Sequence, residues 1–288
     1  MHKGVVLMKL IRLLLILILV LVFTASSTYA TAPSPQPGYT IKTTKLYWRA
    51  MQSSPVAKTL LTNTPVRYTT YNRSWSNVYI GSTRYFTPSS NLKAGIPKLT
   101  STERLRLVNK QHGLSASYRS RQLVTLTIPT VYAKGSERTL MAAEAAHALA
   151  RLYYDGRKQG HTLYALSAYR SYATQKSLYN YWVNARGTAY ASMYVARPGH
   201  SEHQTGLAVD MTSQRMRMGL YASFDQTPEG KWMIQNAHRY GYIVRYPKGK
   251  EKITGYNYEP WHLRYVGVKE ATTMKQNNWT FEDWWAKR

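Results

Sequence analysis

The most prominent hydrophobic feature of the chain is an unbroken apolar run from Leu13 to Phe23. Basic residues precede this run, and small residues follow it up to Ala30. A basic head, a short apolar segment and a small-residue end are typical of a secretory signal peptide, which we predict over residues 1–30. A membrane-spanning helix needs roughly 20 apolar residues. An uncleaved membrane anchor is therefore the less favoured interpretation of this segment.

Residues 39–93 have a different pattern, in which short segments rich in Thr, Tyr and Val alternate with turn residues. This pattern predicts about five short strands and no helix. An all-β region of this size favours a small barrel, which we expect over residues 39–95. The Pro-rich stretch TAPSPQPG at residues 31–38 is predicted to be a linker, as are residues 96–102.

Residues 103–288 mix helical and extended patterns without regular alternation, which favours an α+β domain. We expect helices over residues 137–158, with Ser136 as the N-cap, and over residues 171–186. Thr227 before Pro228 predicts another helix start, and Thr280 with Asp283 predicts a capping box. Strands are expected at TLYALSAY (162–169), LAVDMT (207–212) and YGYIVRYP (240–247).

The charge of the chain is strongly positive and unevenly distributed. The formal net charge is +26, and no Asp or Glu precedes Glu103. Residues 31–100 carry nine Lys or Arg, so this part of the protein should attract polyanions. The predicted export signal favours an anionic cell-wall polymer or membrane over nucleic acid. We therefore predict a secreted, wall-associated protein that does not bind nucleic acid and meets a membrane only if its N-terminal segment is uncleaved.

The chain has no Cys, which restricts its possible chemistry. No disulfide can form, and any metal site must use His and carboxylate ligands. An exported protein without Cys is more typical of a Gram-positive bacterium than of a disulfide-forming periplasm.

Two short motifs supply ligands of this kind. In RPGHSEHQTGLAVD, His203 precedes Asp210 by seven residues, and Gly206 between them allows a close backbone approach. Far downstream, EPWH supplies His262. Two imidazoles and one carboxylate, with a fourth position left open, are the ligand set of a catalytic zinc site. Glu259 lies three residues before His262 and could act as the base that deprotonates an attacking water.

These motifs carry a family resemblance. The blocks SAYRSYATQ, RPGHSEHQTGLAVD and NAHRYGYIVRYPKGKEKITGYNYEPWHLRYVG occur in the order found in VanY-type D-alanyl-D-alanine carboxypeptidases, over roughly residues 103–285. The resemblance implies a compact α+β fold with a central antiparallel sheet. It also implies a zinc enzyme that removes the terminal D-Ala from peptidoglycan stem peptides. The residues it places at the site are the zinc ligands His203, Asp210 and His262, the catalytic base Glu259, and Arg170.

Arg170 directly follows the predicted strand 162–169, which would aim its side chain rigidly. A guanidinium can hold a carboxylate through two hydrogen bonds or stabilise an oxyanion, so we expect a catalytic and substrate-binding role. A structural ion pair with one of the few acids is the alternative. Gln175, Ser201 and Glu202 lie beside the same motifs and are predicted to contact substrate.

The N-terminal region resembles a bacterial Src-homology-3-like domain. The resemblance covers about residues 38–95, through segments such as TTKLYWRA and YNRSWSNVYIG. Domains of that family commonly tether secreted enzymes to the cell wall. The resemblance and the positive charge both predict binding to anionic wall polymers.

Three functional interpretations stay open at this point. The favoured one is a carboxypeptidase of D,D- or L,D-specificity that remodels the cell wall. The second is an endopeptidase of related fold that cuts within the stem peptide. The third is a non-catalytic wall-binding protein, which the complete set of His203, Asp210, His262 and Glu259 argues against.

Overall fold

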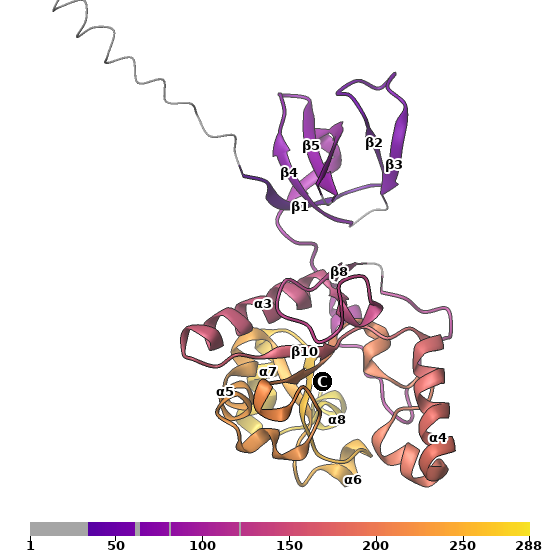
Figure 1. The fold of residues 1–288 in the computed structure, drawn as a ribbon, viewed down its shortest axis with the longest axis vertical. Coiled ribbons are helices and arrows are strands. Elements are labelled where there is room, and N and C mark those ends of the chain that lie inside the picture. Colours follow the sequence, from indigo (N-terminus) through magenta and orange to yellow (C-terminus); the bar gives the residue numbers. More distant parts are fainter. Residues whose placement is uncertain (1–33, 61–63, 81, 121) are drawn as a thin grey trace, which may run out of the picture. The chain divides into compact units, whose positions relative to one another are not determined.

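The computed structural model of the protein describes residues 34–60, 64–80, 82–120 and 122–288 (Figure 1). The predicted signal peptide over residues 1–30 lies outside these residues. Among the described helices, none is both long enough and apolar enough to cross a membrane.

The N-terminal part folds into an antiparallel sheet of seven strands, in the order β3-β2-β6-β5-β4-β1-β7. The strands are β1 (Gln36–Thr40), β2 (Thr44–Tyr47), β3 (Val56–Leu60), β4 (Pro65–Thr70), β5 (Trp75–Ile80), β6 (Thr83–Pro88) and β7 (Leu92–Ala94). A small core of Leu46, Val66 and Val78 lies within it. The sequence predicts about five strands closed into a barrel. The pairings between described residues leave β3 and β7 at the two ends of the sheet and do not close it.

Strand β1 corrects the predicted linker over residues 31–38. Its first residues pair with β4 and β7, and Gly38 lies opposite both Val66 and Ala94. A Cβ at Gly38 would lie 2.5 Å from the Tyr68 ring and 2.9 Å from the Lys93 carbonyl oxygen. Glycine is needed here for close strand packing rather than for a turn. The Pro-Gly composition of this segment therefore gives the wrong prediction for residues 36–38.

The rest of the described chain is built on an antiparallel four-stranded sheet in the order β10-β11-β13-β12. These strands are β10 (Tyr164–Ser167), β11 (Ala208–Thr212), β13 (Glu259–Tyr265) and β12 (Tyr242–Tyr246). Strands β8 (Leu123–Thr125) and β9 (Leu140–Ala142) pair with each other in a separate two-stranded sheet. The predicted α+β class with a central antiparallel sheet is confirmed.

Among the described residues, helices and short turns of 3-10 helix surround this sheet (Figure 1), except for η1, which belongs to the N-terminal sheet. The α-helices are α2 (Ser101–Arg104), α3 (Ala143–Lys158), α4 (Tyr172–Tyr194), α5 (Pro228–Asn236), α6 (Glu251–Thr254), α7 (Val268–Asn277) and α8 (Phe281–Ala286). The 3-10 turns are η1 (Ser89–Asn91), η2 (Glu137–Thr139), η3 (Glu202–Thr205), η4 (Gln214–Met216), η5 (Ala222–Gln226) and η6 (Ala237–Tyr240).

The main hydrophobic core joins α3 to the four-stranded sheet. Leu149 and Leu152 of α3 belong to the same buried cluster as Leu163, Val209 and Leu263 from the sheet region. A second cluster includes Ile243 of β12, Met274 of α7 and Phe281 of α8. Strand β11 is buried along its whole length, so the residues it carries are held in fixed positions.

Several predicted boundaries shift in the structure. Ser136 does act as an N-cap, but only for the turn η2, and helix α3 begins at Ala143 rather than at residue 137. The intervening residues Leu140–Ala142 instead pair with β8. Helix α4 continues beyond the predicted residue 186 to Tyr194, past a non-helical Gly187. The Thr227 cap of α5 and the Thr280–Asp283 capping box of α8 are confirmed.

Gly230 provides a test of how closely α5 packs against η5. A Cβ at this position would lie 1.9 Å from the backbone oxygen of Phe224, which cannot move without displacing the buried Phe224 itself. We expect Gly230→Ala to lower the free energy of unfolding by about 1–3 kcal/mol. Lys231→Ala, on the exposed side of the same helix, should change it by less than about 0.5 kcal/mol. Equal denaturation midpoints for the two variants would contradict this close packing of Gly230 against Phe224.

Candidate active site

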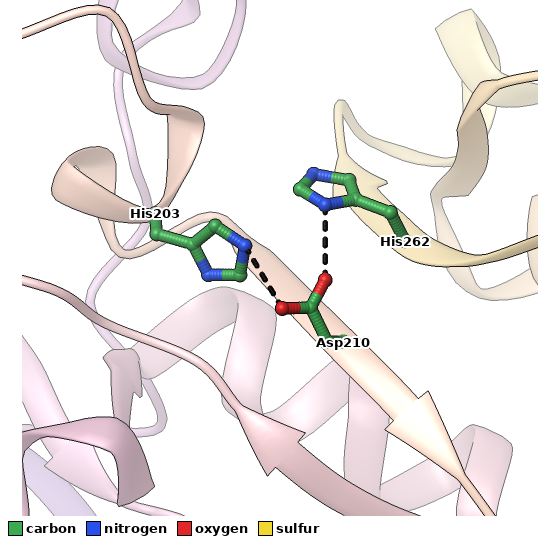
Figure 2. Close-up of side chains that lie close together, drawn as sticks. All are labelled: His203, Asp210 and His262. Carbon is green, nitrogen blue, oxygen red and sulfur yellow. Dashed lines mark ion pairs between the residues drawn. The ribbon is translucent and has the colours of Figure 1, made fainter. Parts of the chain in front are cut away.

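Three potential metal ligands converge on the four-stranded sheet (Figure 2). His203 comes from η3, Asp210 from the middle of β11 and His262 from β13. Asp210 and His262 are direct partners in the pairing of these two strands. The ligand atoms of the three residues all lie within 4.8 Å of one another. The two motifs that are distant in the sequence are therefore joined by strand pairing.

A glycine allows His203 to reach this position. Gly206 ends η3 with a φ of 71°, in the left-handed region that favours glycine. A Cβ there would lie 2.7 Å from the Leu123 side chain. The chain can therefore turn sharply from His203 into β11, as the sequence predicts for this glycine.

One ring nitrogen of His203 is anchored and the other is left for a ligand. The Nδ1 atom lies 2.5 Å from the carbonyl oxygen of Ala168 and donates to it, because a carbonyl can only accept. The Nε2 atom lies 3.3 Å from Oδ2 of Asp210. This Nε2 is buried and has no hydrogen-bond partner among the described residues. A buried polar atom without a partner is costly unless another group, such as a metal, satisfies it.

His262 presents the opposite nitrogen to the site. Its Nδ1 lies 3.0 Å from Oδ1 of Asp210, and its Nε2 lies 3.6 Å from Oε2 of Glu202. A carboxylate behind a ligating imidazole fixes the ring orientation and strengthens the ligand. The set of His203 Nε2, Asp210 and His262 Nδ1 therefore fits zinc, with protein groups holding the far side of each ring.

Glu202 belongs to a buried network of charges below the site. Its Oε1 accepts hydrogen bonds from Arg245 Nε at 2.8 Å and from Arg264 Nη1 at 2.9 Å. Arg245 is also paired with Glu282, at 2.6 Å. The side chains of Glu202, Arg245 and Arg264 are fully buried. Removing one member of such a network leaves another charge buried without a partner, which destabilises a fold strongly.

Arg170 is held in place by several contacts on the other side of the site. Its Nε donates to Gln175 at 3.0 Å, while its Nη1 donates to Ser167 at 2.9 Å and to Asp210 at 3.3 Å. Gln175 is itself fixed, because it donates to the carbonyl oxygen of Ala196 at 2.7 Å. The sequence offers a structural ion pair as the alternative for Arg170, and the Asp210 contact is such a pair. That contact also brings the guanidinium to the potential metal ligands.

Glu259 begins β13 and lies near the three ligands without joining them. Its Oε2 is 3.7 Å from Nδ1 of His262. Burial raises the pKa of Glu259 to about 8, although the charges of His262 and Arg170 act in the opposite direction. A carboxyl group with a pKa close to neutral can both accept and return a proton. Glu259 is therefore suited to proton transfer in a way that Asp210 is not.

Asp210 and the two histidines have shifted pKa values of their own. Burial disfavours the charged form of Asp210, yet His203 and His262 hold its pKa well below the usual range. Burial, together with the Arg170 charge, lowers the pKa of His203 to about 4. For His262 burial acts downward, but the nearby carboxylates of Asp210 and Glu202 raise the pKa to about 9. Two carboxylates with widely separated pKa values indicate a division of chemical roles.

The site opens into a cleft of about 780 Å³. Arg170, Ser201, Glu259 and the three potential ligands all line this cleft. Much of the remaining lining is aromatic and includes Tyr221, Tyr246, Tyr256, Tyr258 and Trp261. The cleft is therefore large enough for an extended peptide, with the polar groups gathered at one place.

Two of the predicted substrate contacts have other partners in the structure. Gln175 is buried and bonds to Arg170 and to the backbone, so it positions the guanidinium. Glu202 also lines the cleft, but it is buried and paired with two arginines, so its predicted substrate contact stays a prediction and its observed role is to pair these charges. Ser201 lines the cleft, so its substrate contact stays a prediction. Arg245 and Arg264 are not predicted from the sequence, although a charged residue within an otherwise apolar strand signals a buried partner.

Comparisons with known proteins agree with this geometry. A family model described as VanY, D-alanyl-D-alanine carboxypeptidase, matches residues 138–268. The putative carboxypeptidase YodJ of Bacillus subtilis is 43% identical over 183 residues, which cover 64% of this chain and 67% of YodJ. A D-alanyl-D-alanine carboxypeptidase of Enterococcus faecium is 35% identical over 145 residues, covering 50% of this chain and 43% of that protein.

Solved structures show the same similarity in three dimensions. The LdcB LD-carboxypeptidase superposes with a TM-score of 0.62 at 40% identity, covering 67% of this chain and 94% of LdcB. A variant of the D,D-pentapeptidase VanY in complex with Zn(II) superposes with a TM-score of 0.53 at 31% identity. That match covers 63% of this chain and 98% of the VanY chain.

The protonation of His262 leads to a prediction about metal binding. A ligating imidazole must be neutral, so zinc has to displace the proton that the metal-free site holds on His262 below about pH 9. We expect the apparent zinc affinity to fall about tenfold for each pH unit below this value, with about one proton released per zinc. Calorimetric titration in buffers of different ionisation enthalpy measures this release. An affinity that stays constant from pH 6 to 9 would contradict the assignment.

Proposed function

The chain belongs to the VanY family of D-alanyl-D-alanine carboxypeptidases, and from this premise we propose the role of each active-site residue in hydrolysis. The protein is a zinc-dependent D,D- or L,D-carboxypeptidase that acts on peptidoglycan peptides. The main observation that supports these roles is the convergence of His203, Asp210 and His262 beside a buried Glu259.

In this proposal His203 Nε2, Asp210 and His262 Nδ1 hold the zinc ion. Zinc bound by three protein ligands, with an open position, polarises a carbonyl group and lowers the pKa of water. Glu202 and the Ala168 carbonyl oxygen orient the two imidazoles from behind. Asp210 stays ionised because the neighbouring histidines hold its pKa low, so it contributes a negative charge to the site.

Glu259 is the proposed general base and acid. It takes a proton from the water that attacks the terminal peptide bond and returns this proton to the departing amino group of D-alanine. The raised pKa of Glu259, about 8, supports both halves of this transfer near neutral pH. Its distance of 3.7 Å from His262 Nδ1 places it beside the ligands, where the proton has to move.

Arg170 is proposed to bind the substrate oxygen on which negative charge develops. Its guanidinium lines the cleft beside Asp210, and Gln175 and Ser167 fix its direction. A preorganised cation stabilises a developing charge without having to reorient during the reaction. Ser201 lines the same part of the cleft and is proposed as a weaker substrate contact.

We also propose the remaining organisation of the chain. Residues 1–30 direct export, the seven-stranded sheet that begins at Gln36 is a Src-homology-3-like wall-binding domain, and residues 103–288 form the peptidase. The acid-free sequence before Glu103 supports the wall-binding role. The expected location is the cell wall of a Gram-positive bacterium, outside any compartment that holds nucleic acid.

The base assignment is tested by separating metal binding from turnover. We expect Glu259→Ala to retain zinc but to lose activity by at least about 100-fold, because only proton transfer is removed. His203→Ala should lose zinc and activity together, since it removes a ligand. Zinc content by atomic absorption and alanine release from a stem peptide report the two properties. A zinc-loaded Glu259→Ala protein with full turnover would refute the role of Glu259.

Wall binding is tested with residues 31–288 and isolated cell walls. Retention should be strong at low salt and fall as ionic strength rises, because exposed charges are screened over about 10 Å at 0.1 M salt. Charge reversal at the exposed residues Lys42, Lys45 and Lys58 should weaken retention without changing turnover of a soluble peptide. Equal retention on walls stripped of anionic polymers would show that these polymers are not the ligand.

A further inference from the structure

Helix α4 carries a group of aromatic side chains that the core does not use. Within its 23 residues only Gln175 and Ala191 are buried. Tyr181 and Tyr194 are 63% and 44% exposed, and Trp182 and Tyr190 are half-buried. In Figure 1, α4 lies along one side of the peptidase region. Large aromatic groups kept at a surface usually mark a binding site.

Three of these rings form a stack that lines the active-site cleft, and we call them the α4 ladder: Trp182, Tyr190 and Tyr194. The Trp182 and Tyr190 ring centroids are 5.8 Å apart, and those of Tyr190 and Tyr194 are 4.7 Å apart. The rings are tilted by 34° and 35° relative to each other. The α4 ladder therefore presents a continuous aromatic surface to the same cleft as His203 and Glu259.

The backbone of α4 is bent in a way that builds this ladder. Trp182 and Tyr190 are eight residues apart and would be separated by roughly 12 Å along an unbroken helix, at a rise of about 1.5 Å per residue. Their rings are only 5.8 Å apart because the helix is interrupted at Gly187, where φ is 82° and ψ is 161°. This conformation is accessible essentially only to glycine. The sequence thus places a glycine where the ladder needs the chain to turn.

The ladder is also at a suitable distance from the reacting groups. Gln175 fixes the first part of α4 to Arg170, and Trp182 follows seven residues later, roughly 10 Å along the helix axis. A stem peptide of four residues, with its C-terminal alanine at the metal ligands, reaches roughly 13–14 Å when extended. The amino end of a stem peptide is joined to an amino sugar of the glycan strand. The sugar end of the substrate would therefore come close to the α4 ladder.

We infer that the α4 ladder binds the N-acetylated amino sugar that carries the stem peptide. The apolar C–H face of a pyranose ring fits against the face of an aromatic ring, which carries negative charge in its π-system. The ladder is continuous with the catalytic cleft, so one substrate molecule occupies both. This inference rests on the proposed carboxypeptidase function and adds the glycan as a second recognised part of the substrate.

The experiment compares two soluble substrates with the same stem peptide, one carrying the disaccharide of N-acetylglucosamine and N-acetylmuramic acid and one free. We expect the zinc-loaded wild-type protein to have a higher kcat/KM for the glycan-bearing substrate. Trp182→Ala and Tyr190→Ala should lower that kcat/KM about 3- to 10-fold and leave the value for the free peptide unchanged. Tyr190→Phe, which keeps the ring, should retain the preference.

Two further variants separate binding from folding. Met193→Ala removes an exposed apolar side chain of the same helix that does not line the cleft, so it should leave both substrates unaffected. Gly187→Val removes no ring but strains the turn, and it should reduce the glycan preference as the ladder variants do.

The outcomes distinguish this inference from the proposed function. Equal turnover of the two substrates by the wild-type protein, or equal losses on both in the ladder variants, would overturn the glycan assignment while alanine release still occurs. Release of alanine from neither substrate would overturn the proposed function itself.

Discussion

The antiparallel pairing of β11 with β13 is the constraint on which the active site depends. This pairing sets Asp210 opposite His262, although the two residues are distant in the sequence. The same strand that carries His262 begins at Glu259, which pairs with Tyr246 of β12 after a register irregularity, so the proposed base is positioned from the other side of β13. A shift of one residue between the strands would turn these side chains to the opposite face of the sheet. Metal binding and proton transfer are therefore both fixed by the backbone pairing of β13 with its two neighbouring strands.

A buried group of charges stabilises this arrangement from below. Glu202 is adjacent to His203 in the sequence, faces His262 at 3.6 Å and bonds to Arg245 and Arg264 from β12 and β13. Charges in such a position are costly to bury and are retained only when each has its partners. The network links η3, which carries His203, to β13, which carries His262, and to the neighbouring strand β12. We interpret it as the support that keeps both imidazoles in position before a metal is bound.

Features set by neighbouring residues were predictable from the sequence, and those set by distant partners were not. The Thr227 cap and the Thr280–Asp283 capping box depend on residues three positions apart, and both are present in the structure. The charge pairing of Glu202 could not be predicted, because its partners Arg245 and Arg264 are 43 and 62 residues away. Strand β13 was missed because it contains Pro260 and the buried Arg264, which do not fit the usual strand pattern. The three potential ligands His203, Asp210 and His262 were predictable because they lie in motifs that resemble those of the family in residue type and order. Secondary-structure propensity alone would not have identified them.

The central claim is that a metal-dependent site at β11 and β13 removes one D-alanine from a stem peptide. The most direct measurement is mass spectrometry of defined stem peptides, ending in D-Ala-D-Ala or in a single D-Ala after a diamino acid, incubated with residues 31–288. We predict the loss of a single alanine from one of these substrates and complete inhibition by a zinc chelator, reversed by added zinc. Cleavage within the stem peptide, or alanine release that persists without zinc, would contradict the account.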